Sequence, residues 1–302
     1  MNHSDQLIVV TGAAGLQGGA VARKLLSRGW KVRALTRDVN KPAAQALAAL
    51  GAEVFHADND DRASLDAAFK GAYGVFAVQN YWLPNVGREG EVRQGKAVAE
   101  AAKAAGVQHF VYSSVGAAQR GMGQEHFDSK YEIEQHIQAL GLPYTILRPV
   151  AFMENYNWRR PQITNGAFSS FGLGPDKRTQ LIAVDDIGAF TALAFENPQA
   201  YLGKTIELAG DEPTETQIAA TFSKVIGRPV TLAAPQMPAG ASPTPELMAM
   251  FRFFSGPAYD ADIAALRKVY PALKTLEQWL RETGWENAEP LPMPANTGAW
   301  GG

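Results

Sequence analysis

The feature that most constrains the fold of this chain is a glycine-rich stretch near the N-terminus. Residues 7–10 are apolar and mostly β-branched, residues 11–19 read Thr-Gly-Ala-Ala-Gly-Leu-Gln-Gly-Gly, and a helical apolar pattern follows. This order of strand, tight turn and helix start predicts one βα unit. Backbone N–H groups at a helix start have no partner within the helix and carry the positive end of its dipole. The stretch therefore predicts a binding site for an anion such as a pyrophosphate.

The glycines of this stretch are spaced G-x-x-G-x-x-G, one residue different from the G-x-G-x-x-G pattern of dinucleotide-binding folds. In that interpretation Gly12 permits the turn, Gly15 lets the backbone approach the phosphates, and Gly18 lets helix and strand pack closely. A tight βα turn without a ligand is the alternative. The residues predicted to bind a dinucleotide here are Thr11, Gly12, Gly15, Leu16, Gln17 and Gly18.

Beyond this turn, strand-like apolar runs alternate with helical patterns through the first half of the chain. The predicted strands are residues 31–37, 52–58, 74–80, 109–114 and 143–149. Such alternation is typical of a parallel sheet with right-handed crossovers, so we predict an α/β fold with a Rossmann-type, doubly wound sheet. We expect a dinucleotide-binding domain at 1–150 and a smaller C-terminal α/β lobe at 151–302, some segments of which return to the Rossmann sheet.

The end of the second predicted strand indicates which dinucleotide is bound. An acidic residue there would hold a ribose 2′-hydroxyl, whereas an arginine suits a 2′-phosphate. Arg37 stands at this position with Lys41 close behind, and Asp38 comes one residue too late to be the obvious acceptor. A guanidinium can hold a phosphate by two hydrogen bonds. The sequence therefore favours NADP(H) over NAD(H), with two solvated surface charges as the alternative.

Polar residues also follow the third and fourth predicted strands, where ligands bind in such sheets. Asp58 or one of its acidic neighbours is expected at the adenine edge, although Asp61 is equally suited to cap the helix that follows. The fourth strand ends in Gln79, Asn80 and Tyr81, followed by Trp82, which together form a polar and aromatic mouth.

Composition excludes several other classes of function. The 302 residues carry a formal net charge of −2 without any charged block, which gives no case for direct binding to nucleic acid or a membrane surface. There are no cysteines, so disulfides and thiolate catalysis are excluded, and the five histidines show no metal-ligand spacing. No apolar run approaches the length of a membrane span and no signal peptide is evident, so a cytoplasmic location is expected.

Several short segments fit a known family in order along the chain. They are residues 12–19, Thr36-Arg37, Asn80-Tyr81-Trp82, Gln94-Gly95-Lys96, Tyr112-Ser113-Ser114, His126-Phe-Asp-Ser-Lys130 and Phe152-Met-Glu-Asn155. The chain resembles the NmrA-like group of atypical short-chain dehydrogenases/reductases over nearly its whole length. The Asn-Tyr-Trp and His-Phe-Asp-x-Lys segments are narrower signals than the glycine motif, which many reductases share.

The resemblance implies a Rossmann domain with a small lobe over the nicotinamide end. Some members are NADP(H)-binding regulators that sense the redox ratio, and others reduce quinones with NADPH. By position, the resemblance assigns Arg37 to the 2′-phosphate and Lys96 and Lys130 to the ribose, phosphate or nicotinamide. It also assigns Tyr81 to the loop beside the cofactor, and it adds Phe152 and Asn155 to the predicted cofactor site.

The motif expected of a carbonyl reductase is incomplete. Active short-chain reductases use Tyr-x-x-x-Lys, in which the lysine lowers the tyrosine pKa and the hydroxyl protonates the developing alkoxide. Here His126 precedes Lys130 by four residues, and Tyr131 lies on another helix face. His126, Lys130 and the strand-end Ser113 are candidate catalytic residues, but the sequence favours His126 as a loop or helix-start histidine with no proton to deliver.

Two functions follow, and the sequence does not choose firmly between them. The first is a regulatory or redox-sensing NADP(H) binder that lacks the catalytic tyrosine and acts through a protein partner. The second is an NADPH-dependent oxidoreductase for quinone-like or other electrophilic molecules, since an activated quinone needs less help from a protein acid. In that case a stacking pocket is expected from five aromatic residues, Tyr81, Trp82, Phe152, Tyr156 and Phe254. The oligomeric state is left open.

Overall fold

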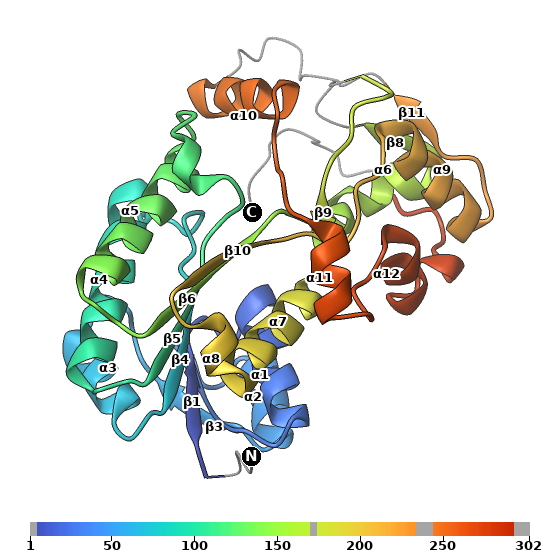
Figure 1. Ribbon diagram of the computed structural model, residues 1–302. Helices are drawn as coiled ribbons and strands as arrows, with labels where there is room; N and C mark the ends of the chain where they lie inside the picture. Colours follow the sequence, from blue (N-terminus) through green and yellow to red (C-terminus); the bar gives the residue numbers. More distant parts are fainter. Residues whose placement is uncertain (1–4, 170–173, 234–243, 293–302) are drawn as a thin grey trace. The chain divides into compact units, whose positions relative to one another are not determined.

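The computed structural model describes residues 5–169, 174–233 and 244–292 (Figure 1). The chain forms two compact units, and each is built from separate stretches of sequence. The first unit comprises Met1–Gly121, Glu125–Pro149 and Val184–Glu207, and the second comprises Met122–Gln124, Val150–Ala183 and Leu208–Gly302. The second half of the sequence thus returns to the first unit through residues 184–207.

A seven-stranded sheet with the order β10-β6-β5-β4-β1-β2-β3 is the centre of the first unit. Its strands are β1 (Leu7–Val10), β2 (Lys31–Thr36), β3 (Glu53–His56), β4 (Gly74–Ala77), β5 (His109–Ser113), β6 (Tyr144–Pro149) and β10 (Lys204–Leu208). The pairs β1–β2, β1–β4, β2–β3, β4–β5 and β5–β6 are all parallel. The predicted doubly wound α/β fold is confirmed, with the reversal of strand order between β1 and β4, where such sheets bind ligands.

Helices cover both faces of this sheet (Figure 1). One face carries α1 (Leu16–Ser27), α2 (Pro42–Ala49) and α7 (Val184–Glu196), with α8 (Pro198–Tyr201) next to α7. The other face carries α3 (Arg62–Phe69), α4 (Gly87–Ala104) and α5 (Glu125–Ala139). Small residues allow the helices to approach closely. A Cβ at Gly188 would lie 3.0 Å from the Ala20 carbonyl oxygen, and one at Gly95 would lie 2.4 Å from Ile133.

The sheet is buried on both faces, as the continuous apolar strands predict. Val9, Val75 and Phe110 are fully buried at the centre of one core, where residues of α3, α4 and α5 pack against them. At the beginning of β5, burial lowers the pKa of His109 to about 4. Its Nε2 lies 2.7 Å from the hydroxyl of Thr145, which itself donates to the Tyr201 carbonyl. The imidazole is therefore neutral and donates through Nε2.

The second unit holds two short parallel strand pairs and a ring of helices. The pairs are β7 (Ala151–Phe152) with β9 (Leu181–Ile182) and β8 (Ala167–Ser169) with β11 (Thr231–Ala233). The α-helices are α6 (Arg160–Thr164), α9 (Glu215–Ile226), α10 (Pro245–Ser255), α11 (Ile263–Val269) and α12 (Leu276–Glu282). Short 3₁₀ turns are η1 (Ala118–Arg120) in the first unit and η2 (Met153–Arg159) and η3 (Trp285–Asn287) in the second.

Aromatic packing holds the second unit together. The Tyr156 ring lies 5.2 Å from that of Phe222, which lies 5.2 Å from Trp285, and Trp279 packs on the same indole. Tyr156 is buried in this core, so the prediction that it lines a substrate pocket is wrong. The reason is that its helical turn presents the ring to α9, a contact that local sequence does not reveal.

Two phenylalanines of helix α10 pack into the core. Phe253 and Phe254 are buried and contact Tyr259 at 5.0 and 5.8 Å between ring centroids, while Phe251 is 42% exposed. Phe254 is therefore a packing residue and not the pocket wall that was expected of it.

Candidate functional site

The predicted glycine turn has the geometry that its spacing requires. Gly12 has a φ of +60°, in the left-handed region that favours glycine. A Cβ on Gly18 would lie 2.3 Å from the Gly12 carbonyl oxygen, so that α1 and the turn approach more closely than any other residue permits. The Gly15 amide donates to the same Gly12 oxygen at 2.9 Å. Gly12 and Gly18 are therefore needed to bring the start of α1 to the end of β1, and a Cβ on Gly15 would lie 3.3 Å from the same oxygen, which makes that position tight as well.

The start of α1 is left open to an anion. Its N-cap residue Gly15 has no side chain to accept from the first-turn amides, and the first turn contains no acidic residue. The amides of Leu16, Gln17 and Gly18 occupy the first-turn positions that have no acceptor within the helix. A phosphate group would supply that acceptor at the positive end of the helix dipole.

Thr11 connects this turn to the neighbouring strand. Its hydroxyl accepts from the Val78 amide at 2.9 Å and lies 3.2 Å from the Val78 carbonyl, to which it donates. The hydroxyl of the fully buried Thr11 is therefore engaged inside the protein, where it fixes the end of β4 beside the end of β1. Its predicted contact with a dinucleotide stays a prediction.

Gln17 and Ser113 meet across this region although they are 96 residues apart in the sequence. The Ser113 hydroxyl, at the end of β5, donates to Gln17 Oε1 at 2.6 Å. The contact joins the first turn of α1 to the carboxyl end of the sheet. Both residues were predicted as site residues, but the sequence did not show that they bind one another.

Gln79 is the clearest sign that this edge of the sheet takes a ligand. It follows β4 and is only 5% exposed, and neither its Oε1 nor its Nε2 has a hydrogen-bond partner among the described residues. Leaving a buried polar group unbonded costs about 1–3 kcal/mol, so native proteins rarely leave both ends of an amide unpaired. The Ser114 hydroxyl, after β5, is also buried without a partner. A ligand with donors and acceptors would satisfy these groups.

The predicted residues after β2 are exposed cations, whereas those after β3 form hydrogen bonds within their own turn. Arg37 and Lys41 are both exposed, and the positive charge of Arg37 lies close enough to Asp60 to help lower the pKa of that carboxyl group. Asp61 accepts from the Ala63 amide at 3.0 Å, which confirms that it caps α3. The carboxylate of Asp58 accepts from the Asp60 amide at 3.0 Å, so that it shapes the turn, and its predicted adenine contact is untested.

Asp60 is held by two residues of α4. Its carboxylate accepts from Arg93 Nε at 2.9 Å and from Gln94 Nε2 at 2.7 Å. Partial burial acts to raise the pKa of Asp60, but these two hydrogen bonds and the charges of Arg93 and Arg37 outweigh it, and the pKa is lowered. Asp60 therefore stays ionised and fixes the turn after β3.

An aromatic cluster follows β4. Ring centroids of Tyr81 and Trp82 are 4.9 Å apart, and the His126 ring on α5 lies 5.2 Å from Trp82. The Tyr81 hydroxyl donates to Glu125 at 2.9 Å, and the Asn80 side chain accepts from the Trp82 amide at 3.0 Å. The loop is thus fixed at several points while the Trp82 side chain stays 57% exposed.

The two predicted lysines both form ion pairs between α4 and α5. Lys96 donates to Glu132 at 2.8 Å, and Arg88 donates to the same carboxylate at 3.0 Å. The hydrogen bond from Lys96 is the main cause that lowers the pKa of Glu132. Lys130 donates at 2.6 Å to Glu91, which is fully buried. Sequence reasoning missed Glu91, because a glutamate in a helical pattern usually lies on the surface.

The remaining predicted residues are divided between the two units. His126 and Lys130 both belong to α5, with the histidine near the helix start. Phe152 lies in β7 and Asn155 in η2, both in the second unit. Their predicted roles toward a cofactor stay predictions.

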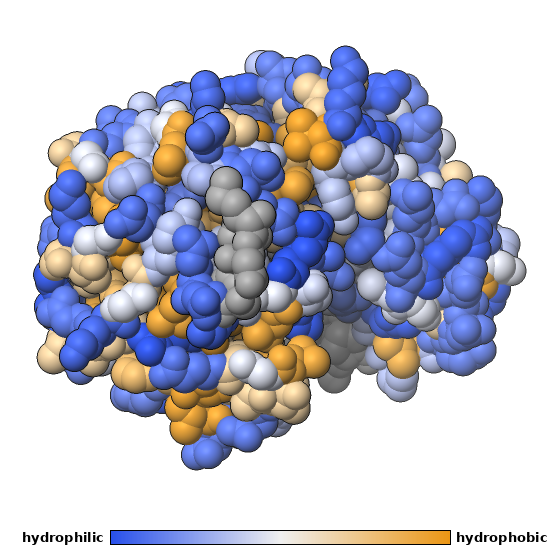
Figure 2. Space-filling view, turned by 60° about the horizontal axis from the view of Figure 1, so that its bottom comes forward, coloured by the Kyte–Doolittle hydropathy of each residue, from blue (hydrophilic) through white to orange (hydrophobic). Residues whose placement is uncertain are grey.

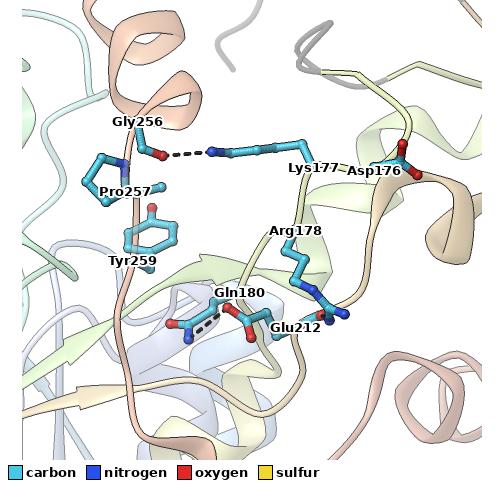
Figure 3. A pocket seen from close by; sticks show the side chains of 9 residues that line it. Asp176, Lys177, Arg178, Gln180, Glu212, Gly256, Pro257 and Tyr259 are labelled. Atoms are coloured by element: carbon cyan, nitrogen blue, oxygen red, sulfur yellow. Dashed lines mark hydrogen bonds between the residues drawn. The ribbon is translucent and has the colours of Figure 1, made fainter.

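A pocket in the second unit was not predicted at all (Figure 3). It has a volume of about 300 Å³ and is lined by nine residues, Asp176, Lys177, Arg178, Gln180, Glu212, Gly256, Pro257, Ala258 and Tyr259. Its polar groups largely satisfy one another. Lys177 donates to the Gly256 carbonyl at 2.8 Å, and Gln180 binds the Ala261 backbone through both ends of its amide, at 2.9 and 3.0 Å.

Residues 5–169, 174–233 and 244–292 contain neither a metal-binding cluster nor a membrane-spanning helix. Within these ranges no group of three histidine, aspartate or glutamate side chains is arranged to hold a metal ion. No helix in the same ranges is long and apolar enough to cross a membrane. The face of the molecule in Figure 2 is mainly hydrophilic, and its apolar residues form small separate patches.

Comparisons with known proteins agree with this architecture. The NmrA-like family matches residues 4–280. The NmrA-like family domain-containing oxidoreductase FrzB of Cladobotryum sp is 32% identical over 248 residues, which are 74% of each chain. The corresponding oxidoreductase malD of Malbranchea aurantiaca is 31% identical over 75% of each chain.

Solved structures share the fold. NmrA, a negative transcriptional regulator solved in complex with NADP, superposes with a TM-score of 0.77 at 22% identity, covering 92% of this chain and 95% of NmrA. An NADPH-dependent quinone oxidoreductase (QOR2) from Escherichia coli gives a TM-score of 0.72 at 28% identity, covering 91% and 99%. The glycine turn, the doubly wound sheet and these matches together establish that the chain belongs to the NmrA-like family.

Proposed function

We propose that this protein binds NADPH at the carboxyl ends of β1, β4 and β5 and uses it to reduce a quinone-like electrophile. The open first turn of α1 carries the cofactor part of the proposal, because it offers unpaired amides and no acidic residue to an incoming pyrophosphate. The unbonded amide of Gln79 supports it, since a carboxamide or ribose can donate to one end and accept from the other.

The preference for NADPH over NADH rests on Arg37. Its guanidinium is exposed just beyond β2, with Lys41 at the start of α2, so both cations are available to a 2′-phosphate. Solved NmrA structures contain NADP in one case and NAD in another, so family membership does not decide the preference.

We expect Arg37→Ala to weaken NADPH binding about tenfold or more and to leave NADH binding unchanged, since a charged hydrogen bond is worth roughly 1.5–3 kcal/mol. Calorimetric titration with both cofactors measures this, and equal affinity of the variant and the wild type for NADPH would refute the assignment.

The proposed reaction is a hydride transfer. When bound, the reduced nicotinamide supplies the hydride. The Tyr81–Trp82–His126 cluster offers a partly exposed aromatic surface on which a planar ring can stack. The ammonium of Lys130 supplies a fixed positive charge that favours negative charge developing on a quinone oxygen. The similarity to FrzB, named an oxidoreductase, and to the quinone oxidoreductase QOR2 supports this class of reaction.

Turnover is tested with the full chain, NADPH and a panel of quinones and aldehydes, followed by loss of reduced-cofactor absorbance. We expect quinone turnover above roughly one per second, within the usual enzymatic range, and little activity on aldehydes. The absence of turnover with every quinone would overturn the reductase proposal but leave NADPH binding intact.

A redox-sensing regulator is the second candidate. The observation that favours it is His126 at the position where active carbonyl reductases have tyrosine. This candidate expects no turnover and an affinity for NADP⁺ that differs from that for NADPH by tenfold or more, since only differential binding can shift a conformational equilibrium. Measuring both dissociation constants on the same protein separates the two candidates.

A further inference from the structure

Glu91 is an unusual residue for the inside of a helix pair. Its side chain on α4 is fully buried, and both carboxylate oxygens are bonded to neighbouring residues of α5. Oε1 accepts from Lys130 Nζ at 2.6 Å, and Oε2 accepts from the Ser129 hydroxyl at 2.5 Å. Burying an ion pair removes both charges from water, and apolar residues of similar volume often give equal or greater stability. Stability alone therefore does not account for this pair.

The place of the pair in the fold points to the ligand site. Glu91 lies in the first half of α4 and Lys130 in the first half of α5. In this doubly wound sheet both helices begin on the side where the parallel strands end, which is the edge that carries Gln79 and Ser113. The pair therefore lies in the layer just below that edge and on the same side of the sheet as the aromatic cluster of Tyr81, Trp82 and His126.

The ammonium of Lys130 is held without being fully satisfied. Among the described residues, Glu91 is its only hydrogen-bond partner, and the lysine side chain is 14% exposed. An ammonium has three N–H donors, so two remain for a ligand. Glu91 in turn has no other cation within ion-pair distance in the described part of the chain. Each member of the pair thus depends on the other for its counter-charge.

A second buried pair between α5 and β6 is arranged differently. Arg148 donates to both oxygens of Glu134, at 2.9 and 2.6 Å, and a further guanidinium nitrogen donates to Gln119. That guanidinium is thus bonded on several sides by protein groups. Burial, with the charges of Glu91 and Glu134 adding to it, raises the pKa of the nearby Tyr112 hydroxyl, so this group stays neutral. The two cations differ in how far the protein satisfies them, since three of the five Arg148 N–H groups are bonded by described residues but only one of the three on Lys130.

We infer that Glu91 is the positioning residue for Lys130: its buried carboxylate holds the ammonium in place below the sheet edge, so that the two N–H groups not bonded to Glu91 contact bound NADPH. Ser129 fixes the second carboxylate oxygen and thereby the direction of the first. This inference rests on the proposed NADPH site, and it adds a residue that the cofactor does not itself touch.

A double-mutant cycle on the full chain tests whether Glu91 acts through Lys130. The variants are Glu91→Gln, Lys130→Met and the double substitution, and the measurements are the NADPH dissociation constant, kcat for a quinone and Tm. We expect each single change to weaken NADPH binding about tenfold, the value of one charged hydrogen bond. The double variant should bind no worse than Lys130→Met, because the effect of Glu91 disappears when its target is gone.

Glu134→Gln is the matched control. It removes the same charge from a buried ion pair next to the same sheet but contacts Arg148, and it should lower Tm while keeping NADPH affinity within about twofold of wild type. If Glu91→Gln does not fold, Ser129→Ala replaces it in the cycle, with an expected weakening of about threefold that vanishes in the Lys130→Met background.

Two results overturn the inference. The first is full additivity of the two substitutions, and the second is a loss of NADPH affinity in Glu134→Gln as large as in Glu91→Gln. A wild-type protein that binds no NADPH would instead refute the proposed function as well. Wild-type binding together with an additive cycle refutes only the role of Glu91.

Discussion

The carboxyl edge of the sheet in the first unit and the pocket of the second unit differ in how their polar groups are bonded. At the sheet edge, Gln79 is buried with both ends of its amide unbonded. In the pocket, Gln180 is equally buried, but its amide donates to the Ala261 carbonyl and accepts from the Ala261 amide. The comparison teaches that a hollow and an unsatisfied polar group need not coincide. The glutamine of the pocket is bonded by the backbone of its own unit, whereas both amide ends of the glutamine at the sheet edge are unbonded among the described residues.

The largest expected effect is that of Gly18→Ala, which acts on the sheet edge alone. The added Cβ would lie 2.3 Å from the Gly12 oxygen, and backbone must move to relieve this. We expect NADPH affinity to fall by roughly a hundredfold or more and the free energy of unfolding to fall by about 2–3 kcal/mol, in the range of overpacking. Titration and denaturant unfolding measure the two effects. Gly256→Ala, at a glycine without a positive φ whose added Cβ would lie 3.6 Å from its nearest neighbours, is the control for the added Cβ and should leave NADPH affinity unchanged. Normal NADPH binding by Gly18→Ala would contradict the proposal that the glycine turn at the sheet edge binds the cofactor.

His109 provides a contrast to Gln79, because its buried Nδ1 is also unbonded but lies at the beginning of β5, away from the carboxyl edge of the sheet. Its effect is therefore expected on stability and not on cofactor binding. Burial lowers its pKa from 6.5 to about 4, so between these pH values the unfolded chain binds a proton that the folded chain does not. Stability is therefore complete above pH 6.5 and declines as pH falls toward 4, by roughly 3 kcal/mol at most. Urea unfolding at several pH values measures this. His109→Gln should show a smaller decline, and an identical decline in the variant would contradict the assignment.

Gln180→Met tests the pocket side of the comparison. Methionine keeps the length of the side chain but removes the acceptor of the Ala261 amide, while the Ala261 carbonyl keeps its bond from the Ile263 amide at 3.0 Å. We expect the free energy of unfolding to fall by about 2 kcal/mol, the penalty for a stranded buried group, with NADPH affinity unchanged. A clear loss of NADPH affinity would instead show that the pocket contributes to cofactor binding.

Gln79→Met is the matched change at the sheet edge and should give the opposite pattern. Because the Gln79 amide has no partner in the described protein, its removal should leave the stability of the free protein unchanged or slightly raised. NADPH affinity should fall about tenfold, the smallest free-energy effect of the four. Thermal unfolding with and without NADPH measures both at once. A destabilised free protein with unchanged affinity would reverse the interpretation of Gln79.

Much of the fold was predictable because its signals are local. The glycine turn, the alternation of strands and helices, and the cap at Asp61 each depend on residues that are neighbours in sequence. Backbone conformation and capping are decided over a few residues, so a single sequence records them. The family segments added the NmrA-like assignment for the same reason, since they are short runs of adjacent residues.

The parts that sequence did not reveal depend on contacts between distant residues. That some C-terminal segments return to the Rossmann sheet was expected, but not that residues 184–207 are the ones that join the first unit. The burial of Tyr156 in the second core and the bond from Ser113 to Gln17 likewise join segments that are far apart in the chain. In the sequence Glu91 resembles an ordinary surface glutamate, but in the structure the packing of α5 against α4 buries it beside Lys130. The burial of a charge and the choice of its partner are properties of the packed core.

The sequence by itself thus determined the glycine turn that opens α1, because turn conformation and helix capping are set by adjacent residues. Only the tertiary structure decided which groups around that turn are satisfied and which are left for a ligand. Gln79 and Gln180 are the same residue type, yet the surrounding backbone bonds one and leaves the other unbonded. Hydrogen-bond satisfaction depends on what packing brings within about 3 Å, and no local pattern records that.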